Sequence, residues 1–202
     1  MNDTYKTIGR QGKGIYKEKM SKFIAFANPV SSPEEARTFI KEIQNEYHDA
    51  RHICWAYMIG PERTIWQLND NGEPSGTAGK PILGQINSRE LTDVAVAVVR
   101  YFGGIKLGTP GLTAAYRESA SLALDDAGIE IRQQTRRFSL SFPYIAVNDI
   151  MKIVKQTSAT IVTQKFDNSC MLTVELPLGK FEAIKERMLG VDGATECETS
   201  PP

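Results

Sequence analysis

Cysteine and long apolar runs are scarce in this sequence. Its 202 residues include only three cysteines, Cys54, Cys170 and Cys197. Because they are odd in number and far apart, they argue against a disulfide framework and against a cysteine metal site. No apolar run is long enough to cross a bilayer, and Met1–Lys6 lacks the charged-then-apolar plan of a secretory signal. We therefore expect a cytoplasmic protein without membrane contact, metal or cofactor.

An excess of charge of one sign is also absent. The chain has 24 basic and 24 acidic residues, and its formal net charge is zero. Nucleic-acid binding rests on the neutralisation of phosphates, so it would require basic residues gathered on one face. Each local concentration of such residues is either a solvated surface or a binding patch. These concentrations are Lys13, Lys17, Lys19 and Lys22, and Arg132, Arg136 and Arg137.

Glycine, in contrast, is concentrated in two stretches, Asp70–Pro81 and Val99–Leu112. Each runs from a predicted strand into a predicted helix. Glycine allows tight turns and a close approach of backbone amides to a bound group, commonly an anion. Because both stretches follow apolar strands, we expect them to lie side by side at one sheet edge and to form one cleft.

The first stretch precedes a helix predicted over about 77–88. The amides of Ser75, Gly76 and Thr77 would lie at its start, where unpaired donors and the helix dipole attract anions, and Lys80 would add a mobile charge. Pro81 after Lys80 excludes a P-loop. The alternative is a structural turn that needs its glycines.

The second stretch places Arg100 at the end of a strand. Arg100 is suited to a phosphate or carboxylate ligand, or to a pair with Asp70 or Glu73 that joins the two loops, and we favour the internal pair. Only one of Tyr101 and Phe102 should face outward, where it could stack on a base. We also expect Gly103 or Gly104 to have a positive φ or to lie against another backbone.

Together these observations predict a surface for anions or nucleic acid. Its candidate residues are Lys22, Arg51, Ser75, Gly76, Thr77, Lys80, Arg100, Gly103, Gly104 and Lys106. No catalytic residue is predicted, because His52 and Cys54 share a strand face without a further catalytic motif.

The order of predicted elements indicates two domains of an α+β protein. Ser32, Pro33 and Glu35 predict a helix start with a capping box, and Val94–Val99 predicts a central strand. From about residue 135 the order is βαββαβ, which is the ferredoxin-like plan. We predict domains over residues 1–132 and 135–202, joined by a linker around 130–135.

Several segments also resemble the signature of the YigZ/IMPACT family. The resemblance covers about residues 15–125, and the C-terminal part resembles the smaller domain of bacterial YigZ-type members. It implies a ribosomal protein S5 domain 2-like fold for the first domain and a ferredoxin-like fold for the second. The matching segments are Ser21–Ile24, Ala50–His52, Asp70–Pro81, Val99–Gly104 and Leu107–Gly108.

The resemblance directs the functional hypotheses towards translation. Eukaryotic IMPACT proteins modulate translation through a protein partner, and the bacterial members have a suspected nucleic-acid or translation role. The leading hypothesis is a non-enzymatic regulator that contacts RNA, the ribosome or a translation factor through the glycine-rich face. The alternatives are a protein-partner regulator without nucleic-acid binding and a hydrolase of a small anionic substrate.

Overall fold

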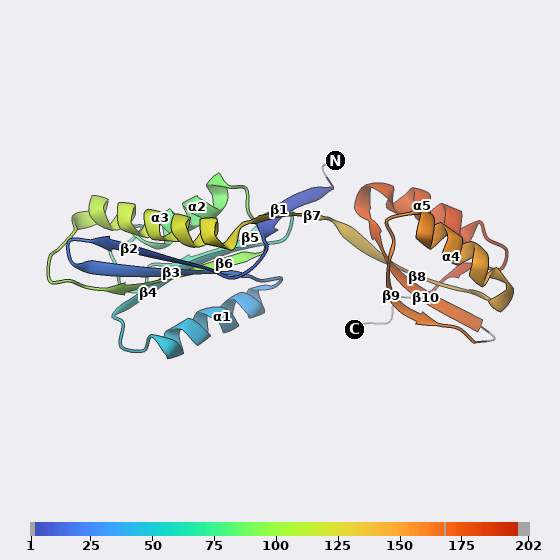
Figure 1. Cartoon of the computed structure of the whole chain (residues 1–202), viewed down its shortest axis with the longest axis horizontal. Helices are drawn as coiled ribbons and strands as arrows, with labels where there is room; N and C mark the ends of the chain where they lie inside the picture. The colour runs from blue at the N-terminus through green and yellow to red at the C-terminus, as the bar shows by residue number, and fades with distance from the viewer. Residues whose placement is uncertain (1–2, 168, 198–202) are drawn as a thin grey trace. The chain divides into compact units, whose positions relative to one another are not determined.

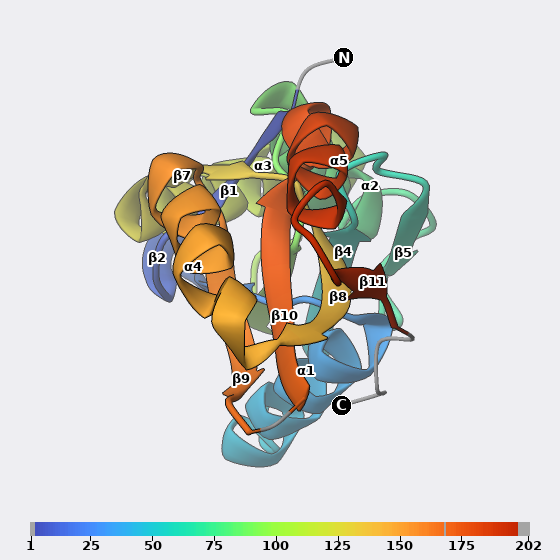
Figure 2. The same ribbon diagram turned by 90° about the vertical axis from the view of Figure 1, so that its right-hand side faces the viewer.

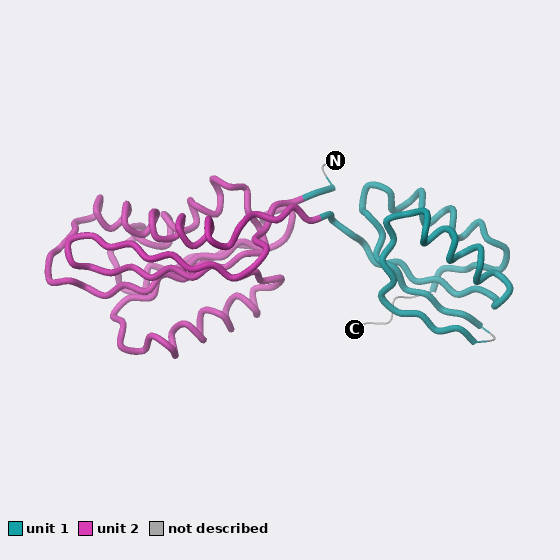
Figure 3. Tube along the Cα trace, in the orientation of Figure 1, with its two compact units in different colours: residues 1–4, 133–202 teal, residues 5–132 magenta. Residues whose placement is uncertain are grey.

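The computed structural model describes residues 3–167 and 169–197 and divides the chain into two compact units (Figure 3). The larger unit contains residues 5–132. The smaller unit contains residues 133–202 together with residues 1–4. The turn expected at Asp167–Asn168 is described only as far as Asp167, and the loose end expected at Pro201–Pro202 lies outside the described residues.

An antiparallel five-stranded sheet forms the centre of the larger unit, in the order β2–β3–β6–β4–β5. The apolar run at Val94–Val99 lies in β6 at the middle of this sheet, which confirms the central strand predicted there. The strands are β2 (Gly12–Glu18), β3 (Ser21–Pro29), β4 (His52–Ile59), β5 (Ile65–Asn69) and β6 (Val94–Tyr101).

Helices cover both faces of this sheet (Figure 1): α1 (Pro33–Glu46) packs on one face, α2 (Gly79–Ser88) and α3 (Gly108–Ala127) on the other. Because successive strand residues point to opposite faces, β6 supplies both cores. Val94, Val96 and Val98 face α2 and α3, whereas the intervening Ala95, Ala97 and Val99 face α1. No helix among the described residues is long and apolar enough to span a membrane.

The start of α1 follows the predicted capping pattern with one difference. The Ser32 hydroxyl accepts a hydrogen bond from the Glu35 amide at 3.2 Å. The Glu35 carboxylate accepts from the Ser31 amide at 2.7 Å, one residue before the partner expected in a capping box. This bond lowers the pKa of Glu35.

Two short strands join the ends of the larger unit, and they correct the predicted linker. β1 (Thr4–Ile8) pairs with β7 (Ile129–Gln133), so only residue 134 lies between β7 and the next strand. Every residue of β7 is exposed. Backbone hydrogen bonds to β1 hold β7 in place, so the sequence of β7 contains no pattern of buried apolar side chains.

The smaller unit has the predicted βαββαβ order in an antiparallel sheet, β11–β8–β10–β9. α4 and α5 cover one face of it (Figure 2) and pack against Leu140, Leu172 and Val174. The chain is thus α+β in both units. The elements are β8 (Thr135–Pro143), η1 (Tyr144–Ala146), α4 (Val147–Gln156), β9 (Thr160–Lys165), β10 (Ser169–Pro177), η2 (Leu178–Lys180), α5 (Phe181–Leu189) and β11 (Thr195–Glu196).

Candidate functional site

The first glycine-rich loop folds around the carboxylate of Asp70. This carboxylate accepts hydrogen bonds from the amides of Gly76, Ala78 and Gly79 at 2.8, 3.0 and 2.8 Å. The chain reverses at Gly76, whose φ of +77° suits glycine. The Thr77 amide donates to the Pro74 carbonyl at 3.0 Å.

These bonds correct the anion site predicted at the start of α2. The amides of Gly76 and Thr77 already have partners inside the loop, and an internal carboxylate takes the place of an external anion. Burial opposes the ionisation of Asp70, but the three amides outweigh it and, with help from Lys80, lower the pKa of this carboxyl.

Replacement of Asp70 by Asn is expected to lower the free energy of unfolding by about 1–3 kcal/mol, because an amide NH2 would face backbone donors. The difference from wild type should be complete above the ordinary Asp pKa of 3.8 and should shrink as the pH falls through the lower folded-state pKa. Urea unfolding at several pH values measures it. Asp192→Asn, at an exposed position, is the matched control. An equal, pH-independent effect of both variants would contradict this prediction.

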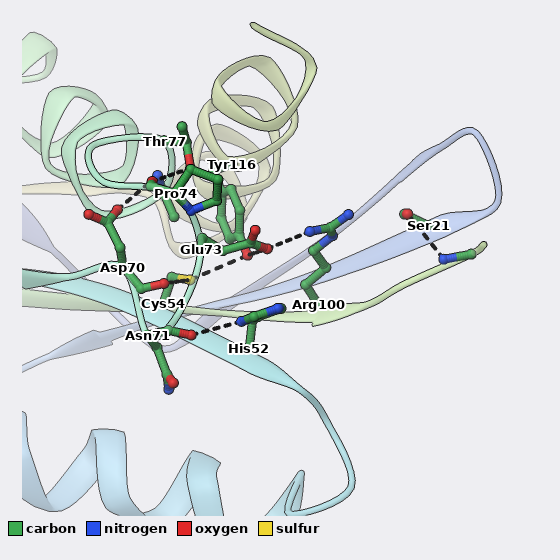
Figure 4. Close-up of polar contacts among 12 residues, drawn as sticks. Ser21, His52, Cys54, Asp70, Asn71, Glu73, Pro74, Thr77, Arg100 and Tyr116 are labelled. Atoms are coloured by element: carbon green, nitrogen blue, oxygen red, sulfur yellow. Dashed lines mark hydrogen bonds and ion pairs between the residues drawn. The ribbon is translucent and has the colours of Figure 1, made fainter. Parts of the chain in front are cut away.

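A buried ion pair joins the two loops (Figure 4). Nη1 of Arg100 donates to Oε1 of Glu73 at 2.6 Å, and the two side chains are only 7% and 3% exposed. Tyr116 on α3 donates to the same carboxylate oxygen at 2.9 Å. The internal pair favoured for Arg100 is therefore confirmed. Arg100 fixes the relative positions of the loops and is not a free cation for a ligand.

Cys54 and His52 do not form a nucleophilic pair. The Cys54 sulfur lies 3.0 Å from the Asp70 carbonyl oxygen and 3.3 Å from the Tyr116 hydroxyl, and burial raises the pKa of the thiol to about 12. Such a thiol is protonated and inert at neutral pH. His52 has its Nδ1 2.8 Å from the Asn71 carbonyl oxygen. Within residues 3–167 and 169–197, no group of three or more His, Cys, Asp or Glu residues could hold a metal ion.

The glycines of the second loop behave as predicted. A Cβ atom at Gly103 would overlap the carbonyl of Met20, and Gly104 has a φ of +85°. The Gly103 amide donates to the Ser21 hydroxyl at 3.2 Å (Figure 4). The turn between β2 and β3 therefore packs directly on this loop, so Gly103 and Gly104 act through backbone geometry.

A cleft of about 410 Å³ lies between the two loops and the start of α3. Glu73 and Arg100 form its buried side, and the half-exposed ring of Phe102 lies beside them. Arg51 and Lys106 are exposed and have no ion-pair partner in the described parts of the chain. The lining residues are Arg51, His52, Glu73, Pro74, Arg100, Phe102, Lys106, Leu107, Gly108, Thr109 and Leu112.

The cleft also contains the N-terminal end of the 20-residue helix α3. Gly108 and Thr109 belong to its first turn, which has no acidic residue and no side-chain cap. Helix N-termini carry unpaired amides and a partial positive charge. The cleft is consequently apolar in its walls and positive at its edge.

The prediction of one shared pocket needs correction. Gly76 and Lys80 line a different hollow, with Gly84 and Arg117, and only Arg51, Arg100 and Lys106 of the predicted residues line the cleft. The Asp70 carboxylate turns the chain at Gly76, so that Glu73 faces the cleft and Lys80 does not. The predicted residues that line neither hollow are Lys22, Ser75, Thr77, Gly103 and Gly104.

The apolar walls of the cleft are not among the residues predicted from the sequence. Pro74, Leu107 and Leu112 have no charge or motif that distinguishes them from core residues. Phe102 was a candidate for stacking, and the structure shows that it is the outward member of its pair, because Tyr101 is partly buried against the α1 core.

Known proteins show similarity over most of the chain. Residues 19–124, which include the whole cleft, match the Impact N-terminal domain. The IMPACT family member YvyE of Bacillus subtilis is 38% identical over 78% of this chain and 72% of its own length. The IMPACT family member YigZ of Escherichia coli is 34% identical over 80% of each chain.

The chain belongs to the IMPACT family. The family extends to eukaryotes, since the Protein IMPACT homolog of Saccharomyces cerevisiae is 31% identical over 45% of this chain and 36% of its own. The crystal structure of a hypothetical protein matches this chain with a TM-score of 0.75 and 26% identity, and the match covers all of this chain and all of the solved one. The two-unit α+β architecture therefore recurs in a known structure.

Proposed function

We propose that this IMPACT family member is a non-enzymatic, cytoplasmic binding protein associated with translation, and that it contacts RNA through the cleft and the surface around it. The observation that carries the proposal is the gathering of unpaired cations around an exposed aromatic ring. Arg51 and Lys106 flank the half-exposed Phe102 in a chain whose net charge is zero. RNA offers both partners of such a surface, phosphates for cations and bases for aromatic rings.

Lys22 stays outside the proposed RNA site. Lys17 and Lys22 lie directly opposite each other on β2 and β3, and neither has an ion-pair partner among the described residues. Lys22 shares its face of the sheet with Ile24 and Tyr101, which pack with the α1 core, whereas Arg100 lies on the other face. The proposal therefore rests on Arg51 and Lys106 and not on this pair of lysines.

We also propose a specific fold for each unit, an S5 domain 2-like fold for the larger one and a ferredoxin-like fold for the smaller one. The βαββαβ order and the strand order β11–β8–β10–β9 support the second assignment. The link to translation rests on family membership, because fold alone does not determine function.

Salt dependence of RNA binding tests the proposal. We expect fluorescence anisotropy to show that a labelled single-stranded RNA binds the full chain and that its affinity falls steeply with salt. The double variant Arg51→Ala, Lys106→Ala should bind more weakly, and its slope of log K against log [salt] should be smaller by about 1–2.

The matched control is Lys41→Ala, Lys152→Ala, which removes two exposed cations from α1 and α4. It should bind RNA as the wild type does. Equal loss of RNA affinity in both double variants would show that the cleft is not the RNA-binding site. Absence of salt-dependent RNA binding by the wild type would contradict the proposed function.

A regulator that docks on a protein partner is the second candidate. The observation that favours it is the exposure of apolar side chains near the cleft, where Met20 is 81% and Ile105 is 50% exposed. Binding through these side chains should be insensitive to salt and should weaken in the variant Met20→Ser, Ile105→Ser, which leaves the cations in place.

A further inference from the structure

The size of the cleft limits what it can hold. Small-molecule sites have volumes of roughly 300–1,000 Å³, and the cleft, at about 410 Å³, lies near the lower end of this range. That space suits one nucleotide better than several. RNA bound along the surface would therefore place one unit in the cleft, with its neighbours outside.

The apolar part of the cleft is suited to a base. The guanidinium of Arg100 lies 5.5 Å from the ring centroid of Phe102 and holds the ring from one side. Arg100 is itself fixed by Glu73 and by the ring of Phe23. The Phe102 side chain is nevertheless 49% exposed, so a preorganised aromatic surface remains available for stacking.

The polar part of the cleft is suited to a phosphate. Arg100 neutralises Glu73 at 2.6 Å, and among the described residues no other acidic side chain lines the cleft. Arg51 and Lys106 then leave the cleft with a positive charge. The first turn of α3 adds amides without a side-chain cap, whereas Asp70 occupies the corresponding amides of α2.

We infer that the cleft binds one nucleotide by two points of recognition, its base against Phe102 and its phosphate at Lys106 and Arg51. This inference rests on the proposed function and specifies the ligand unit at the same site. Neither the base nor the phosphate alone fills both parts of the cleft. A nucleoside monophosphate should accordingly bind better than a nucleoside or inorganic phosphate.

Calorimetric titration of the full chain with AMP, adenosine and inorganic phosphate tests the inference. We expect AMP to bind at least about 5-fold more tightly than inorganic phosphate, since one stacked base contributes roughly that factor or more. AMP should also bind more tightly than adenosine, which lacks the phosphate for Arg51 and Lys106. Phe102→Ala should reduce AMP affinity to that of phosphate. The double variant Arg51→Ala, Lys106→Ala should reduce it to that of adenosine.

The control for Phe102 is Trp66→Ala, because Trp66 is an equally exposed aromatic residue on the edge strand β5. It should leave AMP binding unchanged. If Phe102→Ala does not fold, Phe102→Leu keeps apolar cover over Arg100 and should still lose the contribution of the base. Thermal unfolding of each variant shows whether it is folded.

Three results would overturn the inference: AMP that binds no better than phosphate, AMP affinity that is unchanged in folded Phe102 variants, or a loss in Trp66→Ala equal to that in Phe102→Ala. Its failure is distinguishable from failure of the proposed function. Salt-dependent RNA binding without AMP binding would contradict only the inference that the cleft holds one nucleotide. AMP binding without RNA binding would contradict the proposed RNA function and would leave a nucleotide-binding site.

Discussion

Replacement of Arg100 by Met is expected to lower the free energy of unfolding of the larger unit by about 3–5 kcal/mol, because it leaves the buried Glu73 carboxylate without its charged partner. Met retains an apolar side chain between the rings of Phe23 and Phe102, so the loss reports chiefly on the charge. Urea unfolding followed by tryptophan fluorescence measures it. Both tryptophans, Trp55 and Trp66, lie in the larger unit.

A second variant separates the ion pair from local packing. Glu73→Leu combined with Arg100→Met should destabilise the unit by less than the sum of the single changes, because the double variant holds no unpaired buried charge from this pair. Arg37→Met, which breaks an exposed pair with Glu34, should change stability by only about 0–1 kcal/mol. A similarly small effect of Arg100→Met would show that the Glu73 pair does not hold the loops together.

Replacement of Gly14 by Ala is expected to destabilise the larger unit by about 1–3 kcal/mol or more. A Cβ atom at Gly14 would lie 2.6 Å from the Ala123 nitrogen and 2.6 Å from Leu122 Cβ, both on α3. The obstacle is largely helix backbone, which has no rotamer to change. α3 would have to move away from β2, and this movement would disturb the core between them.

Gly84 supplies the matched control within the same unit. It lies in α2 without a positive φ, and a Cβ atom there would meet nothing within 4 Å. Gly84→Ala should therefore stabilise the unit by about 0.5–1 kcal/mol, since Ala is the better helix former. Thermal unfolding of both variants measures whether each substitution raises or lowers the stability of the unit. A stability gain in Gly14→Ala would contradict the close packing of β2 on α3.

The sequence predicts those parts of the fold whose stability is visible in local patterns. The start of α1 has its capping residues in order, β6 is a continuous apolar run, and the smaller unit alternates its elements as βαββαβ. The sequence does not predict β1 and β7. Their pairing depends on backbone hydrogen bonds between segments more than 100 residues apart, and the exposed side chains of β7 give no apolar pattern.

The same distinction applies to the site. The Arg100–Glu73 pair could be predicted from complementary charges on two adjacent loops. The role of Asp70 is turn chemistry, which is typical of an acidic residue in a glycine-rich loop, but the sequence does not indicate which amides its carboxylate binds. Its three hydrogen bonds to amides turn the loop at Gly76 and separate Lys80 from the cleft. The Asp70 carboxylate thus fixes the path of the loop, and with it which of the predicted residues line the cleft.

Photocrosslinking tests the central claim, RNA contact at the cleft, most directly. A thiouridine-substituted single-stranded RNA is irradiated with the full chain, and mass spectrometry then identifies the crosslinked residues. The account predicts crosslinks at Phe102 and its neighbours in the 102–109 segment, reduced by an excess of AMP and lost in the Arg51→Ala, Lys106→Ala variant. Crosslinks confined to residues outside the cleft and the adjoining β2–β3 turn would contradict it.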